Sequence, residues 1–153
     1  MIVFRICKAR YASEIFSGNG GLKAAGRWHQ KGQRVVYAAQ SLSLAAFELF
    51  VHLGRHDTKI SLASAQATIP DSVEIEVIDR ATLPPNWNES PPVPATADLG
   101  TQWLAEMRTA VLQVPAAVIP GEFDFLINPN HPEFRQLSFS KPETFLLDPR
   151  VWK

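Results

Sequence analysis

Cysteine is almost absent from this sequence of 153 residues, which contains Cys7 alone. A single thiol cannot form an intrachain disulfide, so nothing points to an oxidising compartment. No apolar run is long enough to span a membrane, and Arg5, Lys8 and Arg10 interrupt the apolar start that a signal peptide would need. We therefore expect a cytoplasmic protein without a membrane partner.

An excess of charge of either sign is also absent, because 15 Lys and Arg balance 15 Asp and Glu. A general nucleic-acid binder depends on neutralising phosphates, so we expect no direct nucleic-acid partner. The distribution is nevertheless uneven, with a net charge of +6 over residues 1–60 and −6 over the remainder. A basic half suits a small phosphorylated ligand and an acidic half suits a basic partner, and two solvated faces without a ligand are the alternative.

Two kinds of catalytic site lack their usual sequence patterns. The histidines and the cysteine show no metal-ligand spacing of a known type, so we expect no metal; the residues are Cys7, His29, His52, His56 and His131. His52 and His56 are four residues apart, which is weak evidence by itself. No Gly-x-Ser-x-Gly segment is present that would indicate a serine nucleophile.

The composition is that of an ordinary globular protein, 46% apolar and 20% charged, and the length suits one compact domain over residues 1–153. Bulky, β-branched or alternating segments predict strands at 1–8, 33–40, 72–79, 110–120 and 122–129. Between them, residues 16–21 form a glycine-rich flexible segment, and five prolines make residues 83–97 a long surface loop. The elements do not alternate as βαβ units, which favours an α+β fold with mixed sheets and flanking helices.

Two helices are expected. The first begins at Ser41 or Ser43 as N-cap and ends near Leu53, before Gly54. Its apolar residues form two stripes, Leu42, Ala45, Ala46, Leu49, Phe50 and Leu53 on one and Leu44, Phe47 and Val51 on the other, which predicts burial on two sides. The second is capped by Thr96 or Asp98, with a core face of Leu99, Trp103, Met107, Ala110 and Val111.

Glu48 is the most informative residue of the first helix. Together with His52 it lies on the narrow polar seam between the two stripes. A lone carboxylate on an almost wholly apolar helix costs free energy unless it is paired or its pKa is raised, and such acids often mark sites. Glycoside chemistry would need a second acid near Glu48, and the sequence cannot place Asp57, Asp98 or Asp124 there.

Arg27 and Tyr37 are the other candidates in the same stretch. Arg27 follows Gly26 on a loop, where its planar guanidinium suits phosphate or pyrophosphate, although a structural ion pair would explain it too. Tyr37 on the strand 33–40 could offer its ring for stacking and its hydroxyl for orientation, or it could be a core tyrosine.

These residues resemble the RES-domain toxins of bacterial RES–Xre toxin–antitoxin pairs. The similarity covers "GRWHQKGQRVVYAAQSLSLAAFELFVHL", "VPAAVIPGEFDFLINPNHPEF" and "FLLDPRVWK". The resemblance implies a fold similar to that of ADP-ribosylating toxins and a protein that uses NAD as its substrate, cleaving it by hydrolysis or phosphorolysis or transferring ADP-ribose to a protein. It also implies an Xre-type antitoxin as partner, in a complex that could contain a homodimer of this chain.

The family's active-site arginine, tyrosine and glutamate fall on Arg27, Tyr37 and Glu48. The resemblance then implies that Arg27 holds the diphosphate, that Tyr37 stacks near the nicotinamide or ribose, and that Glu48 stabilises positive charge on the ribose. Arg5 and the residue at position 116 complete the expected NAD-binding set.

Three positions depart from the family pattern. Ala116 replaces the usual serine, and His29 and Asp124 stand where asparagine is common. Either another group supplies the serine hydroxyl, or the protein is weakened, or the residue was changed to make a toxic enzyme tolerable to its host.

Three functions are therefore open. The first is an NAD-consuming toxin, the second a protein ADP-ribosyltransferase with the same site, and the third an inactive member that only binds its antitoxin. Large apolar residues are candidates for that partner surface, although ordinary packing is the favoured interpretation: Trp87, Phe134, Phe139 and Trp152.

Overall fold

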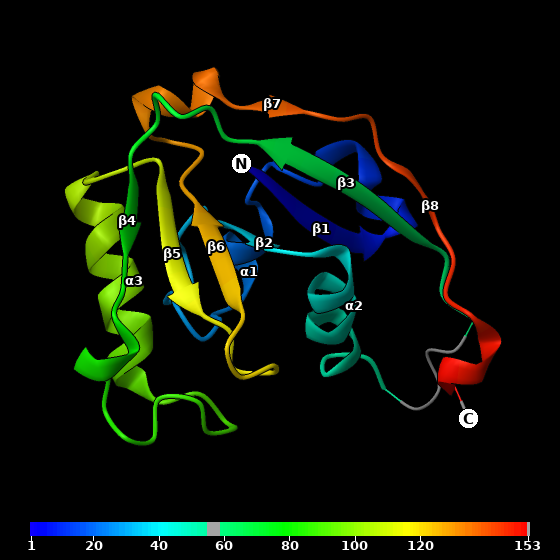
Figure 1. The fold of residues 1–153 in the computed structure, drawn as a ribbon, viewed down its shortest axis with the longest axis horizontal. Helices are drawn as coiled ribbons and strands as arrows, with labels where there is room; N and C mark the ends of the chain where they lie inside the picture. Colours follow the sequence, from blue (N-terminus) through cyan, green and yellow to red (C-terminus); the bar gives the residue numbers. More distant parts are fainter. Residues whose placement is uncertain (55–58, 153) are drawn as a thin grey trace.

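Eight strands form one mixed sheet in the computed structural model, which describes residues 1–54 and 59–152 (Figure 1). The order across the sheet is β4-β5-β6-β2-β1-β3-β7, and β8 also pairs with β3. β4 and β5 are parallel, and the other pairs are antiparallel. The α+β prediction is confirmed. The strands are β1 (Ile2–Lys8), β2 (Val36–Ala39), β3 (Leu62–Thr68), β4 (Ile75–Val77), β5 (Val111–Pro115), β6 (Phe123–Ile127), β7 (Ser138–Phe139) and β8 (Glu143–Phe145).

The sheet opens between β1 and β2. Within these two strands the pairing is at Phe4 opposite Ala39, whereas β1 pairs with β3 over its whole length. The half formed by β2, β6, β5 and β4 therefore diverges from the half formed by β1 and β3, as Figure 1 shows. This opening positions the candidate site.

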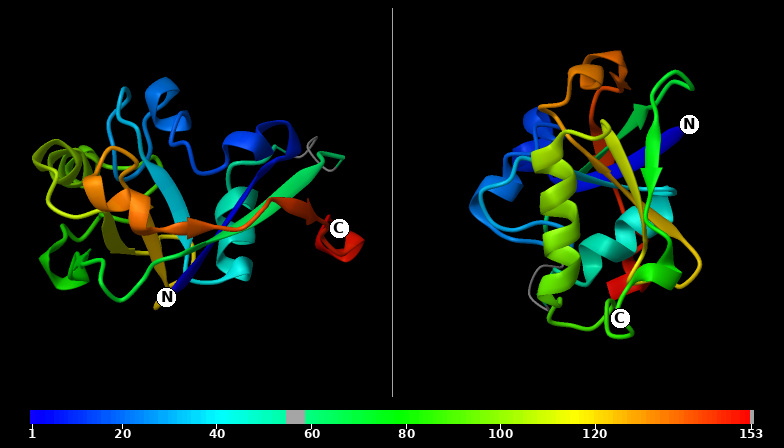
Figure 2. Two further views of the ribbon diagram at one scale, coloured as in Figure 1. Left: turned by 90° about the horizontal axis from the view of Figure 1, so that it is seen from above. Right: turned by 90° about the vertical axis from the view of Figure 1, so that its left-hand side faces the viewer.

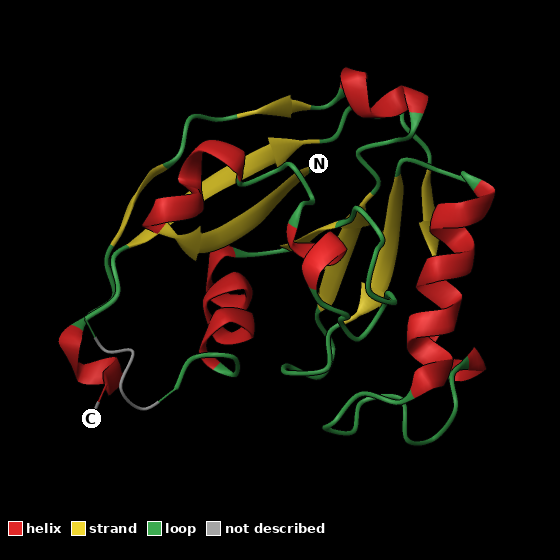
Figure 3. Cartoon of the chain, turned by 180° about the vertical axis from the view of Figure 1, so that it is seen from behind, coloured by secondary structure: helices red, strands yellow, loops and turns green. Residues whose placement is uncertain are grey.

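Among the described residues, three helices flank the sheet: α1 (Gly20–Lys23), α2 (Leu42–Phe50) and α3 (Pro94–Glu106). Figure 2 shows α3 along one face of the β4 to β6 half, and in Figure 3 α2 lies beside the opening of the sheet. Short 3₁₀ turns at Ala9–Glu14, Arg80–Thr82, Pro132–Gln136 and Pro149–Trp152 complete the described elements. None of the helices in the described part of the chain is long and apolar enough to cross a bilayer.

The prediction for α2 is partly correct. Ser41 is the N-cap, its hydroxyl accepting from the Leu44 N–H (3.1 Å), but the helix ends at Phe50, earlier than expected. Burial on two sides is wrong, because Phe47 and Val51 are 50% and 59% exposed. Leu44 of the second stripe is 1% exposed and packs in the core, so only Phe47 and Val51 of that stripe remain at the surface of this chain.

The prediction for α3 is wrong at its start and only partly correct for the buried face, where Trp103 is buried as expected. Pro94 occupies the first turn and needs no N–H partner there, so the helix begins before Thr96 and Asp98, the caps expected from the sequence. Leu99 and Met107 are exposed at 36% and 38%. The residues that α3 buries are Thr96, Gly100, Trp103 and Leu104, while Ala110 and Val111 are buried beyond its end.

Other corrections are local. The expected strand at 72–79 shortens to Ile75–Val77, and the glycine-rich segment contains one helical turn, α1. Trp87 is 5% exposed and packs in the core beside Trp28, so it is no surface for a partner. Phe139 is 38% exposed, and its ring packs against the rings of Phe16 and of the half-buried Phe134. The side chain of Trp152, and His56 and Asp57, lie outside the described residues.

Candidate active site

Arg27 lies on a tight turn, residues 26–29, closed by a main-chain hydrogen bond of 3.0 Å. The next residue, Trp28, is 2% exposed and anchors the turn in the core against α3. A Cβ on Gly100 of α3 would lie 1.8 Å from the Trp28 carbonyl oxygen, so only glycine allows this approach. The turn is therefore held rigidly from behind.

The Tyr37 hydroxyl joins this turn to β2. It accepts from the Trp28 N–H (3.1 Å) and lies 2.7 Å from Nδ1 of His29. Nε2 of His29 lies 2.9 Å from the Ala24 carbonyl, which can only accept, so Nε2 carries the proton and Tyr37 donates to Nδ1. Burial raises the pKa of Tyr37 and lowers the pKa of His29, so both are neutral at neutral pH. Because the fold uses the hydroxyl, the ring is the part of Tyr37 that remains for a ligand.

The guanidinium of Arg27 is tied to the proline-rich loop. Its Nη1 donates to the carbonyl oxygens of Trp87 (2.8 Å) and Glu89 (3.0 Å). Burial lowers the pKa of Arg27, and the charge of Glu48 opposes that shift, so Glu48 lies within electrostatic range of the guanidinium. Nε and Nη2 have no hydrogen-bond partner in the described part of the chain, and they remain as donors for an anion.

Arg5 lies behind Tyr37, in the opening between β1 and β2. It donates from Nη1 to the Tyr37 carbonyl (2.6 Å). Its guanidinium is buried, which lowers the pKa of Arg5, and Nε has no partner among the described residues. The observed role is to brace β2 below the candidate site, and contact with NAD stays a prediction.

Glu48 and Asp124 form a carboxyl pair. Asp124 on β6 is 8% exposed and hydrogen-bonds Glu48 of α2, and Oε1 of Glu48 is buried without an N–H or hydroxyl donor in the described residues. Burial first, and then the charges of Glu48 and Glu122, raise the pKa of Asp124 above neutrality. A proton on Asp124 supplies the donor that the pair otherwise lacks. At neutral pH the pair therefore carries one negative charge.

Asp124→Asn should stabilise the fold at neutral pH. The unfolded chain ionises Asp124 near pH 4 whereas the folded chain keeps the proton, so the free energy of unfolding falls as pH rises above that value. Asparagine stays neutral and can still donate to Glu48, so we expect a gain of about 1–3 kcal/mol at pH 7.5 that disappears below about pH 4. Urea unfolding of the parent and of Asp124→Asn at the two pH values measures this difference in stability. An equal loss of stability in the variant at both pH values would contradict the prediction.

Ala116 lies where β5 ends. It is 3% exposed and packs with Ala39, Leu44 and Ala45, and its side chain has no group that could orient a substrate. The same residue lines a cavity of about 460 Å³ between the end of β5, the start of β6 and the proline-rich loop. The cavity lies beside the group of Arg27, Tyr37 and Glu48 and is not lined by them.

The structure thus brings together residues far apart in the sequence. The electrostatic interactions connect Arg27 with Glu48, Tyr37 with Arg5 and Arg27, and Glu48 with Asp124. Asp98, another acid considered for the pair, is exposed and accepts a hydrogen bond from Gln30 instead. Asp124 was named as a possible second acid that the sequence could not place, and the structure puts it beside Glu48. The missed residue is Glu122, and the alternation of acidic and apolar residues in "EFDF" was the available signal.

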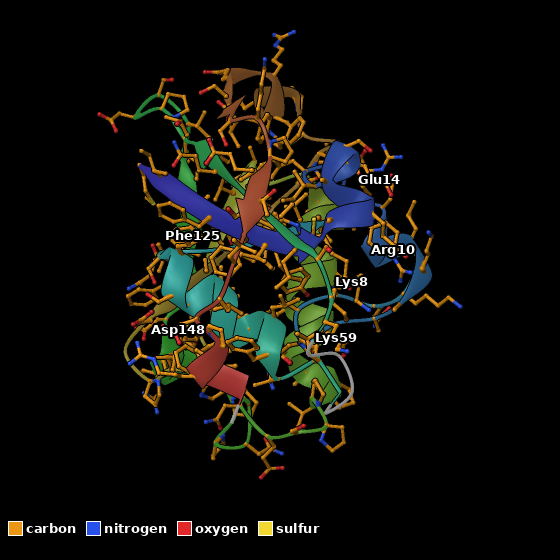
Figure 4. All side chains as sticks on the ribbon, turned by 90° about the vertical axis from the view of Figure 1, so that its right-hand side faces the viewer. Lys8, Arg10, Glu14, Lys59, Phe125 and Asp148 are labelled. Carbon is orange, nitrogen blue, oxygen red and sulfur yellow. The ribbon has the colours of Figure 1, made fainter. Side chains whose placement is uncertain are left out.

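A second basic group lies elsewhere. Lys8 and Arg10 line a hollow with Ser61, and Figure 4 labels them near Lys59 on the face turned to the viewer.

A solved structure shares this fold. A chain of the Mycobacterium tuberculosis MbcT–MbcA toxin–antitoxin complex superposes with a TM-score of 0.74 at 16% identity, over 99% of this chain and 86% of that one. The two chains thus share the same overall fold.

The chain belongs to the RES domain family, whose profile matches residues 2–148. A protein of Photorhabdus laumondii named Toxin Res is 33% identical, covering 100% of this chain and 98% of its own length. Another Toxin Res, of Yersinia enterocolitica, is 36% identical over 99% of both chains. A Sphingobium protein named Prs ADP-ribosylating toxin is 35% identical over 92% of this chain and 89% of its own.

Proposed function

We propose that this protein is a RES toxin that cleaves the nicotinamide–ribose bond of NAD and thereby depletes it. The observation that carries the proposal is the buried Glu48–Asp124 carboxyl pair beside the free donors of Arg27. A buried anion stabilises the positive charge that develops on the ribose when such a bond breaks. Arg27 suits the diphosphate of the same molecule.

The proposed reaction breaks the bond between C1′ of the ribose and N1 of the nicotinamide ring. The bonding electrons stay with the ring, which leaves as neutral nicotinamide. An oxygen of water or of inorganic phosphate bonds to C1′ and releases its proton. Glu48 faces the ribose cation, Arg27 holds the diphosphate, Tyr37 stacks beside the reacting end, and Arg5 supports Tyr37.

Transfer to a protein is the second candidate. The name of the Sphingobium relative, an ADP-ribosylating toxin, favours it. In that reaction a side chain of the target protein replaces water as the group that bonds to C1′. Label from NAD would then appear on protein, whereas hydrolysis or phosphorolysis leaves it on small molecules.

An antitoxin is the proposed partner, because the structural neighbour was solved in a toxin–antitoxin complex. The proposal includes an antitoxin of the Xre type and a homodimer of this chain within the complex. It also includes one domain over residues 1–153, action in the cytoplasm and an activity that needs no metal. If Ala116 has removed the activity, the chain acts only by binding its antitoxin.

NAD consumption by the purified chain tests the proposal, with and without phosphate, beside Ala116→Ser. Residue 116 belongs to the same core cluster as residues of α2 and also lines the cavity, so a serine hydroxyl at this position would lie next to the site. We expect nicotinamide from both proteins, with the serine form faster by about 10-fold or more. Turnover in the serine form alone would mean that the present chain is inactivated. If neither protein turns over NAD but label from NAD appears on protein, the result would favour the ADP-ribosyltransferase. If no label appears either, it would favour an inactive chain that only binds its antitoxin.

A further inference from the structure

Glu122 is a half-buried residue whose carboxylate the proposed reaction does not use. Its Oε2 is buried, and no described residue donates to it. Glu122 also lines the 460 Å³ cavity. A buried carboxylate oxygen without a donor is costly, so a ligand that brings an N–H into this cavity would relieve the cost.

The other walls of the cavity suit a flat, polar ring. Trp87 contributes an indole, with the Arg80 guanidinium 6.0 Å from its ring centroid. Asn88 and Gln113 line the same space, and each carries an amide that can donate a hydrogen bond. Aromatic surface combined with a few polar groups is typical of small-molecule sites of this volume.

The cavity adjoins the carboxyl pair. Glu122 precedes Asp124 by two residues, and its charge contributes to the protonation of Asp124. The Ala116 N–H donates to the Glu122 carbonyl (2.9 Å), which holds this segment against the end of β5. A ring in the cavity would therefore lie next to the group proposed to face the reacting ribose.

We propose that this cavity binds the nicotinamide ring of the substrate, with the carboxamide N–H₂ donating to Oε2 of Glu122 and its carbonyl accepting from Asn88 or Gln113. The inference rests on the proposed function. Adenine also carries an N–H₂ group, but it lies at the opposite end of the dinucleotide from the bond that breaks. Proximity to Glu48 and Asp124 favours the nicotinamide end.

Three dinucleotides test the assignment: NAD, its nicotinic acid analogue and its hypoxanthine analogue. The nicotinic acid analogue places a carboxylate against Glu122, so we expect kcat/KM at least about 30-fold below that of NAD. Glu122→Gln can donate to that carboxylate, and the preference should fall to about threefold or less. Glu143→Gln, an exposed acid on β8, is the matched control and should keep the full preference.

A binding measurement makes the test independent of turnover. Ligand-observed NMR titration compares nicotinamide with nicotinate on the parent chain and on Glu122→Gln. We expect the parent to favour nicotinamide and the variant to lose this preference. If that holds while NAD is not consumed, the inference stands and the proposed function fails.

Other results would overturn the inference. An unchanged preference in Glu122→Gln would remove Glu122 from recognition. A preference for NAD over the hypoxanthine analogue that Glu122→Gln abolishes would assign the cavity to adenine. Failure of nicotinamide to bind, with NAD still consumed, would reject the site and leave the proposed function intact.

Discussion

Glu48→Gln is expected to lower NAD turnover by about a thousandfold or more and to abolish toxicity. The substitution keeps the shape of the side chain and removes the negative charge of the carboxyl pair. A neutral amide cannot stabilise the positive charge on the ribose, so the barrier to bond cleavage rises while the substrate still binds. Chromatography of released nicotinamide and growth of cells that express the variant measure the two effects.

The control for this prediction separates catalysis from folding. Glu48 is half-buried on α2, so its variant must be compared by circular dichroism and thermal unfolding with the parent. Loss of the Glu48 charge also removes a repulsion that raises the pKa of Asp124, and the fold should therefore not be destabilised. Turnover retained in a folded Glu48→Gln protein would exclude Glu48 from the mechanism.

Arg27→Lys should weaken NAD binding by about 10- to 100-fold. Lysine keeps the charge but loses the fork that, in the parent, donates to the loop carbonyls through Nη1 and leaves Nε and Nη2 for the diphosphate. The loop at Trp87 and Glu89 loses an anchor as well. Isothermal titration with NAD and with ADP-ribose, which shares the diphosphate, measures the loss.

Arg135→Ala is the matched control for Arg27, because Arg135 is exposed on the 3₁₀ turn before β7. Its affinity for NAD should equal that of the parent. If Arg27→Lys binds both ligands as tightly as the parent does, the diphosphate contact is wrong. If it loses affinity for NAD alone, Arg27 would act at the nicotinamide end.

Local features of the fold were predictable from the sequence. The alternation of residues 1–8 predicted β1, and Ser41 was one of two expected helix caps, with Ser43, because a hydroxyl before an apolar run can satisfy an N–H of the first turn. Boundaries were less predictable. Pro94 started α3 earlier than the expected caps, and Phe47 and Val51 showed that an apolar stripe need not be buried.

The sequence by itself determined which residues stand out: Arg27 after a glycine, Tyr37 in an apolar strand, and Glu48 on an apolar helix. Each of them stands out because its chemistry differs from that of its neighbours in the sequence. Only the tertiary structure decided that Asp124 meets Glu48, because β6 pairs with β2 with Asp124 opposite Ala39, immediately before α2. Charge and desolvation act through space, and so the protonation of Asp124 depends on strand register and helix packing that no local pattern specifies.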